Sequence, residues 1–420
     1  MAASPLLKRS PQNWEEEFAG VSYFQSFRRK CARWLFVGLC ILFAAVLLST
    51  TALILFTKLN DPFRSPGSLA EVVYSHAPVV LLHRKEVYFP TEVEWYARHC
   101  QLRRSDNHDI LMRNITDPLA ILKASYVDDK NIPIYADIRS HEKESLFYLD
   151  LLDDHGKSGN GVDQESLKDV PVYAHIVRYN HSDFFDIQYF FFYGFNGHVM
   201  SLATEPLGEH EADWEHITVR VDMRGKNVLA VFFNAHSDEG KWLKTSRSLR
   251  DVRDVGAEED SDDQGEDFFT LTDSEGMQRT LVFAALQTHA VYPRPGRQSR
   301  FLFGAVYDDT GADGLMWHTY RNIRLLPPVF AGEPQYRYVQ WGEVVSGAPS
   351  QPEATHAGPD QVKSACPYSQ PHCMAVSFQA TLAGLFNGRW GEPHGWGKVW
   401  KGNGPTGPAV KTYYYDGKED

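Results

Sequence analysis

Hydrophobic residues follow two patterns along the chain, one continuous run near the start and short alternating segments after it. The run extends from Trp34 to Thr57, which is 24 residues without a charged side chain. About 20 apolar residues are enough to cross the core of a bilayer as a helix. The run has no polar face that a soluble helix would turn to water. It therefore predicts a transmembrane helix over residues 34–57.

The charges that flank this run predict its orientation. Four basic residues precede it at positions 28–33, whereas two, Lys58 and Arg64, follow it closely. The side with more Lys and Arg stays in the cytosol. A cleaved signal peptide is the alternative, but its apolar core has ~7–15 residues and begins close to Met1. We expect an uncleaved type II signal-anchor, with a cytosolic tail over residues 1–33, a stem over 58–70 and a luminal domain over 71–420.

Beyond the stem, apolar and polar residues alternate with a period of two, which is the pattern of β-strands. Long amphipathic helices are scarce. The alternating segments are Val79–Leu82, Val172–Tyr179, Ile187–Phe195, Trp214–Val221, Leu229–Ala235, Leu281–Leu286 and Phe301–Tyr307. They predict an all-β luminal domain, an antiparallel β-sandwich with long irregular loops. Two of these loops are an acidic insertion at 251–267, expected to be disordered, and a Pro- and Ala-rich loop at 346–360.

Composition narrows the classes of function. The 420 residues include 42 Lys or Arg and 54 Asp or Glu, a net charge of −12, which argues against a general nucleic-acid binder. The mean hydropathy of −0.38 excludes a polytopic membrane protein and allows one span. Two sequons, Asn114-Ile-Thr and Asn180-His-Ser, predict N-glycosylation of the luminal domain. The three luminal cysteines allow one disulfide, and Cys366–Cys373 is the closest pair, with the pairing left open.

The segment Gly208–His216 carries the densest set of ionisable residues. Side chains two apart on a strand share a face, so Asp213 and Glu215 face the same way as the apolar residues at 217, 219 and 221. Two such carboxylates repel each other and lose hydration, so a divalent cation, a Lys or Arg, or shared protons must compensate. With His210 folded back toward the pair, calcium or magnesium is favoured, and zinc or manganese is the alternative. Contact with water or Arg220 is the reading without a metal.

Polar residues at other strand ends predict a rim where loops converge. Asn196, His236 and His289 each follow a different apolar strand. In a catalytic site, Glu215 or Asp213 would act as general base on a metal-bound water, with His236 or His289 as proton donor. No nucleophile elbow, P-loop or zincin motif is found in the sequence.

Five segments, in order, resemble the vacuolar protein sorting-associated protein 62 family. They are Ala77–His83 leading to Tyr88–Trp95, Gly208–His216, Asn234–Ser237, Leu286–Pro293, and Phe386–Gly391 with Gly404–Pro408. The likeness covers most of residues 71–410. The chain departs from the family at Gln287-Thr288, where Gly-Ser usually precedes the His, and in its acidic insertion. The family's name implies a role in delivering proteins to the vacuole.

Gly208–Glu215 is also similar to the G-H-R-H-D-W-E motif of the Nep1-like necrosis-inducing cytolysins, which are β-sandwich proteins. That resemblance implies that His210, Asp213 and Glu215 bind a divalent cation used at membrane glycans. This chain has Ala212 where the toxins have their second His. The fourth ligand is left open between Asn196 and Glu205.

These patterns favour a single-pass membrane protein whose luminal domain binds a glycan or lipid head group at a divalent-cation rim. It would serve vacuolar or other endomembrane sorting, with the plasma membrane as the alternative location. A metal-dependent hydrolase is the second interpretation, although the sequence favours a protein that is not an enzyme. The third is a structural or cargo-adaptor protein without a metal site. The expected partners are membrane lipid, a glycan or lipid head group, and sorting cargo, but not nucleic acid.

Overall fold

The computed structural model describes residues 30, 32–53, 66–118, 120–121, 147–179, 182–198, 200–202, 205–235, 240–253, 267–301, 306–326, 329–330, 376–377, 382–386, 388–393 and 402–408. The chain divides into two compact units, Met1–Asp61 and Pro62–Asp420. Several predicted features lie outside the described residues, namely Asn180, His236, Cys366, Cys373, most of the acidic insertion and the loop 346–360.

The first unit contains a helix, Ala32–Leu53, that is long and apolar enough to cross a membrane. Its apolar side chains are exposed rather than covered by other residues of the protein, as expected of side chains that face lipid. The hydroxyls near its end donate to backbone carbonyls one turn earlier, so they are satisfied inside the helix (Ser49, Thr50 and Thr51). A signal sequence near the N-terminus can pass the same test of length and hydropathy, so the type II orientation stays a prediction.

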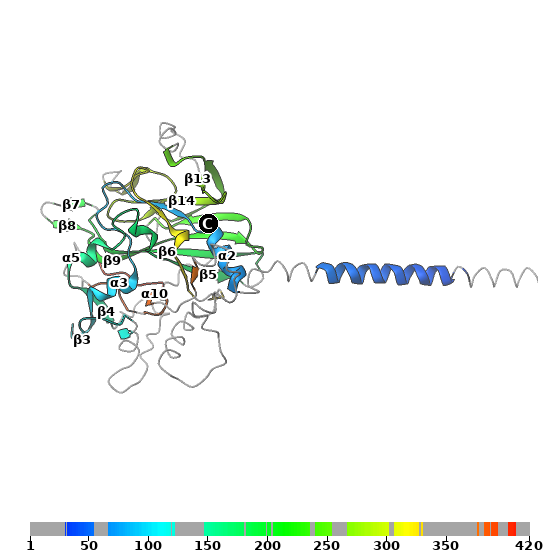
Figure 1. The fold of residues 1–420 in the computed structure, drawn as a ribbon, viewed down its shortest axis with the longest axis horizontal. Helices are drawn as coiled ribbons and strands as arrows, with labels where there is room; N and C mark the ends of the chain where they lie inside the picture. Colours follow the sequence, from blue (N-terminus) through cyan, green and yellow to red (C-terminus); the bar gives the residue numbers. More distant parts are fainter. Residues whose placement is uncertain are drawn as a thin grey trace, which may run out of the picture. The chain divides into compact units, whose positions relative to one another are not determined.

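The second unit consists mostly of strands with few helices, as predicted (Figure 1). The helices are α2 (Pro66–His76), α3 (Val93–Arg98), α5 (Asp154–Ser158) and α10 (Leu382–Leu385), with 3-10 turns η2 (Ser166–Lys168) and η4 (Thr319–Arg321). The strands are β1 (Val79–Leu81), β2 (Cys100–Arg104), β3 (Ile110–Met112), β4 (Phe147–Leu151), β5 (Val172–Arg178), β6 (Phe184–Asn196), β7 (Met200–Leu202), β8 (Glu205–Leu207), β9 (His210–Asp222), β10 (Val228–Phe233), β11 (Lys241–Leu243), β12 (Thr245–Leu249), β13 (Asp267–Thr272), β14 (Gln278–Ala284), β15 (Val291–Tyr292), β16 (Gly296–Phe301), β17 (Val306–Thr310), β18 (Met316–His318), β19 (Ile323–Leu325), β20 (Val329–Phe330) and β21 (Val376–Ser377).

An eight-stranded sheet forms the centre of this unit, with the order β11-β10-β9-β6-β5-β19-β21 and β20 paired to β5. Its middle strands, β6 and β9, are each 13 residues long and pair antiparallel over their length. Phe191 and Ile217 face a first core cluster, whereas Phe190, Phe192 and Trp214 face a second one. Because both faces of the sheet are buried, β6 shows a nearly continuous aromatic run.

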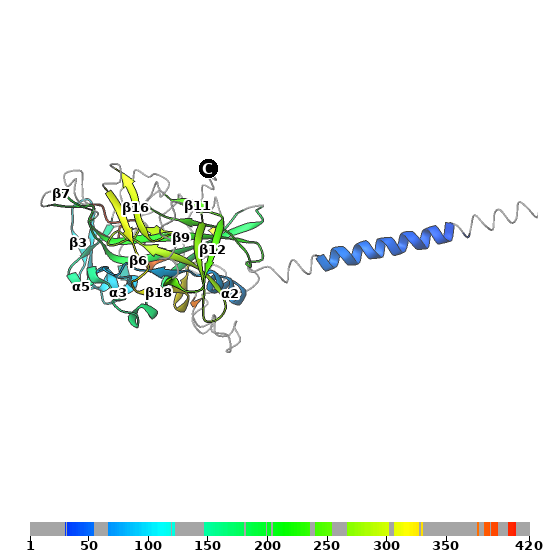
Figure 2. The same ribbon diagram turned by 90° about the horizontal axis from the view of Figure 1, so that it is seen from above.

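A six-stranded sheet has the order β12-β13-β14-β1-β18, with β15 also paired to β14 (Figure 2). It is not purely antiparallel, because β1 pairs parallel to β14 and β12 parallel to β13. The larger sheet is mixed too, since β19 runs parallel to both β5 and β21. The antiparallel prediction therefore holds for the ladder β11-β10-β9-β6-β5 and is wrong where β14 meets β1, where β12 meets β13 and where β19 meets β5 and β21. Alternation of apolar residues indicates a strand but does not give the direction of its neighbour.

Six of the seven predicted strands match β1, β5, β6, β9, β10 and β14 to within a few residues. The seventh prediction, Phe301–Tyr307, spans the end of β16 and the start of β17, two strands that pair with each other. The predicted stem, 58–70, overlaps the start of α2. This helix is buried in the first core cluster, and the hydroxyl of Tyr189 donates to the carbonyl of Val73 at 2.7 Å.

Candidate functional site

Asp213 and Glu215 lie in the middle of the eight-stranded sheet, on β9 and opposite two aromatic residues of β6. Both are buried, with 6% of each residue exposed. They alternate with Trp214, which belongs to the second core cluster, so the two carboxylates face the first cluster. Carboxylates on an apolar face require a compensating positive charge. The structure supplies that charge from His289, which is distant in sequence.

His289 lies in the turn after β14 and is completely buried. Its Nδ1–H donates to Oδ2 of Asp213 at 2.9 Å, and its Nε2–H donates to the carbonyl of Tyr88 at 3.1 Å. A second carboxylate oxygen, Oε1 of Glu86, lies 3.8 Å from Nε2. The imidazole stacks on Tyr193, with ring centroids 3.8 Å apart and planes 9° from parallel. The ring is thus fixed on both edges and on one face.

These contacts determine the charge of the imidazole. Burial by itself would lower the pKa of His289, but the hydrogen bonds and charges of Asp213 and Glu86 raise it to about 9. His289 is therefore protonated at neutral pH. Burial would raise the pKa of Glu86, but His289 and backbone N–H groups lower it. We call Glu86, His289 and Asp213 the buried ion cluster.

Glu86 is the member of this cluster that sequence reasoning missed. Its Oε1 accepts the backbone N–H groups of Val87 and Tyr88, each at 2.9 Å, and its Oε2 accepts the N–H of Gln287 at 2.8 Å. The carboxylate is thus satisfied by the main chain on both oxygens. In sequence, Glu86 is a single acidic residue between two basic residues and an aromatic segment. Only its position five residues after the buried strand β1 could have drawn attention to it.

The turn that carries His289 has a strained backbone. Gln287 and His289 have φ values of 65° and 57°, in the left-handed region that non-glycine residues avoid at a cost of roughly 1–2 kcal/mol each. The turn is held by Glu86, which accepts the N–H of Gln287, and by Thr288, whose hydroxyl donates to Oδ1 of Asp308 at 2.8 Å. These contacts keep the imidazole inside the core.

The second predicted carboxylate has a different partner. The side-chain amide of Asn234, which follows β10, donates to Oε2 of Glu215 at 3.2 Å. Asn234 is buried as well. Its segment was singled out in the sequence for its family resemblance and for the neighbouring His236, which is outside the described residues. The amide itself is the group that reaches the site.

His210 and Asn196 donate hydrogen bonds to backbone carbonyls near the β6–β9 connection, rather than to Asp213 or Glu215. Nδ1 of His210 donates to the carbonyl of Ala212 at 2.7 Å. The amide of Asn196 donates to the carbonyl of Gly208 at 3.0 Å, which closes the connection between β6 and β9. Ala212 has a φ of 54°, and this left-handed residue turns Glu211 away from Asp213. Glu211 instead accepts the backbone N–H groups of residues 151 and 392.

The predicted ligands His210, Asp213 and Glu215 each bond to a protein group in this geometry. Across the part of the chain that the structure describes, no group of three or more His, Cys, Asp or Glu side chains is arranged to hold a metal ion. Asp213 is bound to a protonated His289, which already meets the need for positive charge. Glu205 lies on β8. The divalent cation stays a prediction.

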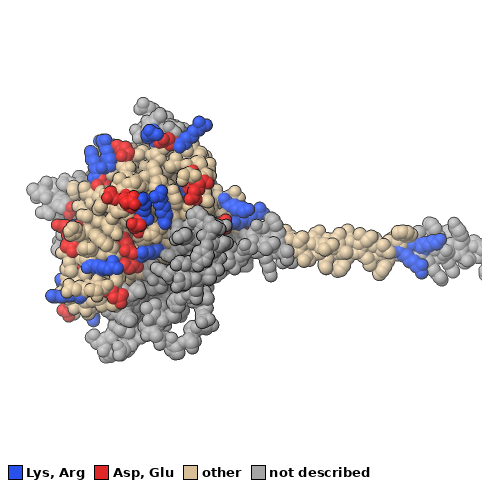
Figure 3. Space-filling model, in the orientation of Figure 1, with Lys and Arg blue, Asp and Glu red and all other residues tan. Residues whose placement is uncertain are grey.

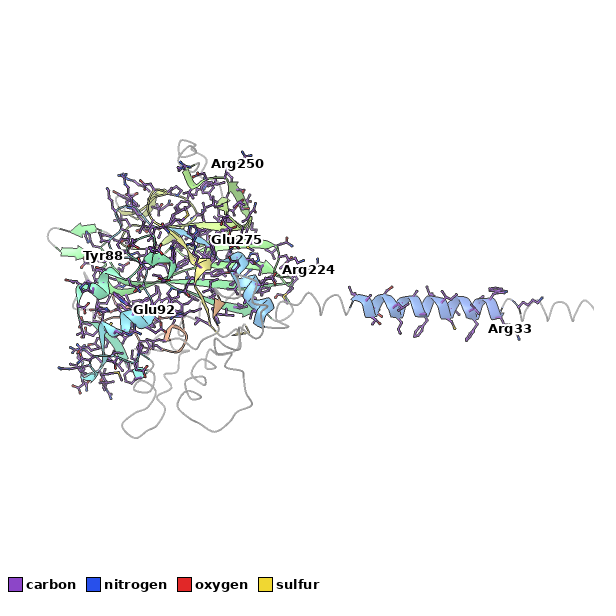
Figure 4. The ribbon with its side chains drawn as sticks, in the orientation of Figure 1. Arg33, Tyr88, Glu92, Arg224, Arg250 and Glu275 are labelled. Atoms are coloured by element: carbon purple, nitrogen blue, oxygen red, sulfur yellow. The ribbon has the colours of Figure 1, made fainter. Side chains whose placement is uncertain are left out.

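The predicted convergence of loops is present around this cluster. The N–H of Gly197, just after β6, donates to the carbonyl of Gln287 at 2.9 Å, which joins the β6–β9 loop to the turn of His289. Tyr88 contacts both, through His289 and through Phe195, whose ring centroid is 4.9 Å away. Figure 4 labels Tyr88, which marks this region of the domain. We call this junction of residues 86–89, 195–198 and 286–289 the loop junction.

The contacts of His289 are those of a buried cation between carboxylates rather than those of a base that activates a nucleophile. A catalytic His–Asp pair needs a hydroxyl or thiol at the second nitrogen of the imidazole. Here Nε2 of His289 faces the carbonyl of Tyr88, which has no proton to give up. The fold and the site define the class of protein: an apolar helix followed in sequence by a β-rich domain. The buried ion cluster lies inside this domain, next to the loop junction.

Comparison with known proteins shows which family this domain resembles. Residues 65–249 match the family model of vacuolar protein sorting-associated protein 62. This match includes α2, the central strands of the large sheet, and Glu86, Asp213 and Glu215. Over these residues the chain is similar to that family, as its sequence resemblance predicted.

Two curated proteins of Saccharomyces cerevisiae (strain ATCC 204508 / S288c) are similar to the chain. The putative vacuolar protein sorting-associated protein TDA6 is 28% identical over 286 residues, which cover 64% of this chain and 56% of the relative. Vacuolar protein sorting-associated protein 62 is 24% identical over 272 residues, which cover 62% of this chain and 54% of the relative. The chain thus matches little more than half the length of these relatives.

Solved structures with a toxin fold also align with the chain. One, described as "NLPPya in complex with glucosamine", is 13% identical, covers 60% of this chain and 81% of its own, and has a TM-score of 0.18. Another, described as "Toxin fold for microbial attack and plant defense", is 14% identical, covers 30% and 49%, and has a TM-score of 0.15. At these scores the alignments carry no argument about fold or ligand.

Proposed function

We propose that the protein is a single-pass type II membrane protein whose β-rich domain lies in the lumen of the vacuole or another endomembrane compartment and assists protein sorting. The observation that carries the proposal is the sequence of elements: an apolar helix, Ala32–Leu53, and then a domain related to vacuolar sorting-associated proteins. The excess of basic residues before the helix supports a cytosolic N-terminus.

Protease protection of sealed microsomes tests the orientation. With an epitope tag at each end of the full chain, the C-terminal tag should resist protease until detergent is added, whereas the N-terminal tag should be lost at once. Loss of the C-terminal tag in sealed vesicles would rule out a luminal domain. A shortened chain that carries only the C-terminal tag before protease is added would instead identify a cleaved signal sequence.

We further propose that the two main sheets pack face to face as a β-sandwich. The first core cluster supports this, because it contains residues from both sheets: Val80 and Val282 from the six-stranded sheet and Ile187 and Val219 from the eight-stranded sheet. One continuous apolar core between two sheets is the arrangement that sandwiches have.

The ligand is proposed to bind at the loop junction and to be a glycan or a lipid head group. Two observations support this: three loops meet there, and Tyr88 provides a half-buried aromatic ring beside Phe195, whose ring centroid lies 5.1 Å from Nζ of Lys157. An aromatic ring beside polar side chains is a combination that sugar hydroxyls and their apolar faces can use. The described residues give no geometry for a cation in this recognition.

A binding screen tests the ligand proposal. The full chain in nanodiscs would be applied to immobilised glycans and to lipid vesicles, beside a Tyr88→Ser variant and a Val228→Ser control at an exposed strand position. Binding that Tyr88→Ser abolishes and Val228→Ser retains would support the loop junction. Equal binding by all three proteins would place the ligand elsewhere.

A further inference from the structure

Strand β12 is unusually open for a strand of a large sheet. Within the described residues it pairs only with β13, and it ends the order of the six-stranded sheet. Four successive residues, Thr245 to Ser248, are exposed, and only Leu249 is buried. In an ordinary half-buried strand every second residue would be covered. Both faces and one edge of β12 are therefore accessible.

The residues around this edge are strongly basic. Lys and Arg recur at every third position from β11 to just beyond β12, and all five are exposed (Lys241, Lys244, Arg247, Arg250 and Arg253). Figure 3 shows Lys and Arg side chains at the upper edge of the domain in this view, and Figure 4 labels Arg250 there. We call these five residues with β12 the basic edge.

Two acidic residues among the described ones pair with the basic edge. Asp267 lies 3.5 Å from Arg247 and 3.9 Å from Arg294, so it is shared by two arginines, and Asp251 pairs with Arg253. With Arg294 included, six basic residues lie beside these two acidic ones. Counted over the described residues, this surface has an excess of positive charge, in a chain whose net charge is −12.

We propose that the basic edge binds an acidic, extended peptide segment of a partner protein by strand addition. The free edge of β12 offers its N–H and C=O groups to such a strand, and its Ser and Thr hydroxyls add donors. The basic side chains then select the sign of the partner, because charge complementarity across an interface favours acidic segments and rejects basic ones. The proposal does not depend on the ligand at the loop junction or on a cation.

Charge and hydrogen bonding together argue against two other occupants. A second copy of the chain would place an identical basic edge against this one, and like charges repel. An anionic membrane would satisfy the charges but would leave the hydrogen-bonding groups of the edge unused. An extended acidic peptide satisfies both.

Fluorescence anisotropy with a defined peptide tests the proposal. The probe is a fluorescein-labelled ten-residue peptide of alternating Glu and Thr, added to the full chain in detergent micelles. We expect saturable binding that weakens about tenfold when NaCl is raised from ~50 to ~500 mM. The same peptide with alternate backbone amides N-methylated keeps its charge but cannot pair with an edge, so it should bind about tenfold more weakly.

Charge-reversal variants locate the binding. Lys244→Glu with Arg250→Glu should weaken binding of the peptide about tenfold, since neither side chain has a described partner in the fold. The matched control, Lys85→Glu with Lys226→Glu, makes the same change in net charge at exposed positions outside the basic edge and should leave binding within about twofold.

A second form of the protein tests whether the acidic insertion of the chain competes with the peptide for the basic edge. Residues 254–266 contain seven acidic residues, and replacing them by a Gly-Ser segment of equal length removes their charge. Binding of the peptide by neither form would overturn the proposal. So would equal binding of the N-methylated peptide, or binding only to phosphatidylserine vesicles, since each would show attraction by charge without strand addition.

Discussion

Replacing Asp213 by Asn removes one carboxylate from the buried ion cluster while it keeps the shape of the side chain. The pKa of His289 is raised from 6.5 to about 9, and a shift of one unit corresponds to about 1.4 kcal/mol. The carboxylates together therefore stabilise the protonated imidazole by about 3 kcal/mol. Removing one partner of a buried pair typically costs about 3–5 kcal/mol. We expect Asp213→Asn to lower the free energy of unfolding by about 3 kcal/mol at pH 6.

The pH dependence gives this prediction its sign. The folded pKa of His289 lies above its unfolded value of 6.5, so its contribution to stability is fully present below pH 6.5 and is lost as the pH rises through about 9. The wild-type protein should therefore lose stability between pH 6.5 and 9. The Asp213→Asn variant should lose less over this range, because its imidazole has less stabilisation to give up.

Urea unfolding of the full chain, followed by tryptophan fluorescence in detergent with a chelator present, measures both effects. The control is Asp309→Asn, which removes a half-exposed carboxylate 3.8 Å from Nε2 of His83 and should cost less than about 1 kcal/mol. If Asp213→Asn costs no more than this control, and the pH slope is unchanged, then His289 is not held as a cation and the description of the ion cluster is wrong.

Three further predictions follow from the same structure. A divalent cation present at ~100 times its dissociation constant would stabilise the fold by about 2.7 kcal/mol. Chelation should therefore lower the unfolding temperature of the wild type and leave that of an Asp213→Asn/Glu215→Gln variant unchanged. A protein that contains no metal and shows no shift on chelation would refute the cation. Gly194→Ala should lower the free energy of unfolding in urea by about 3 kcal/mol or more, because an added Cβ would lie 1.9 Å from a carbonyl oxygen of α5. Its control is Gly276→Ala, where an added Cβ meets no atom within 4 Å and only backbone strain of about 1 kcal/mol is expected. Asn114→Gln should increase gel mobility by one glycan if the exposed sequon is luminal, and no change, together with insensitivity to glycosidase, would count against its modification.

The sequence by itself determined the elements that depend on local pattern. A run of uncharged residues predicts the apolar helix, since only composition and length decide whether a segment can cross a bilayer. Alternation predicts β5, β6 and β9 and the face that Asp213 and Glu215 share, because the period of a strand is a local property. The requirement that these carboxylates meet a positive charge follows from burial and electrostatics alone.

The tertiary structure decided which group meets that requirement. The sequence pointed to a metal or a Lys or Arg, whereas the structure brings in His289 from 76 residues away and Glu86 from 127 residues before Asp213. The sequence marks His289 only as a polar residue after a strand and does not mark Glu86, because contacts across a sheet depend on pairing between distant segments. Ala212 with its left-handed backbone and the strained turn at Gln287 are also set by packing, which local propensity does not contain. The direction of the edge strands, including the parallel β12, depends on how the chain crosses between sheets, and only the folded arrangement shows it.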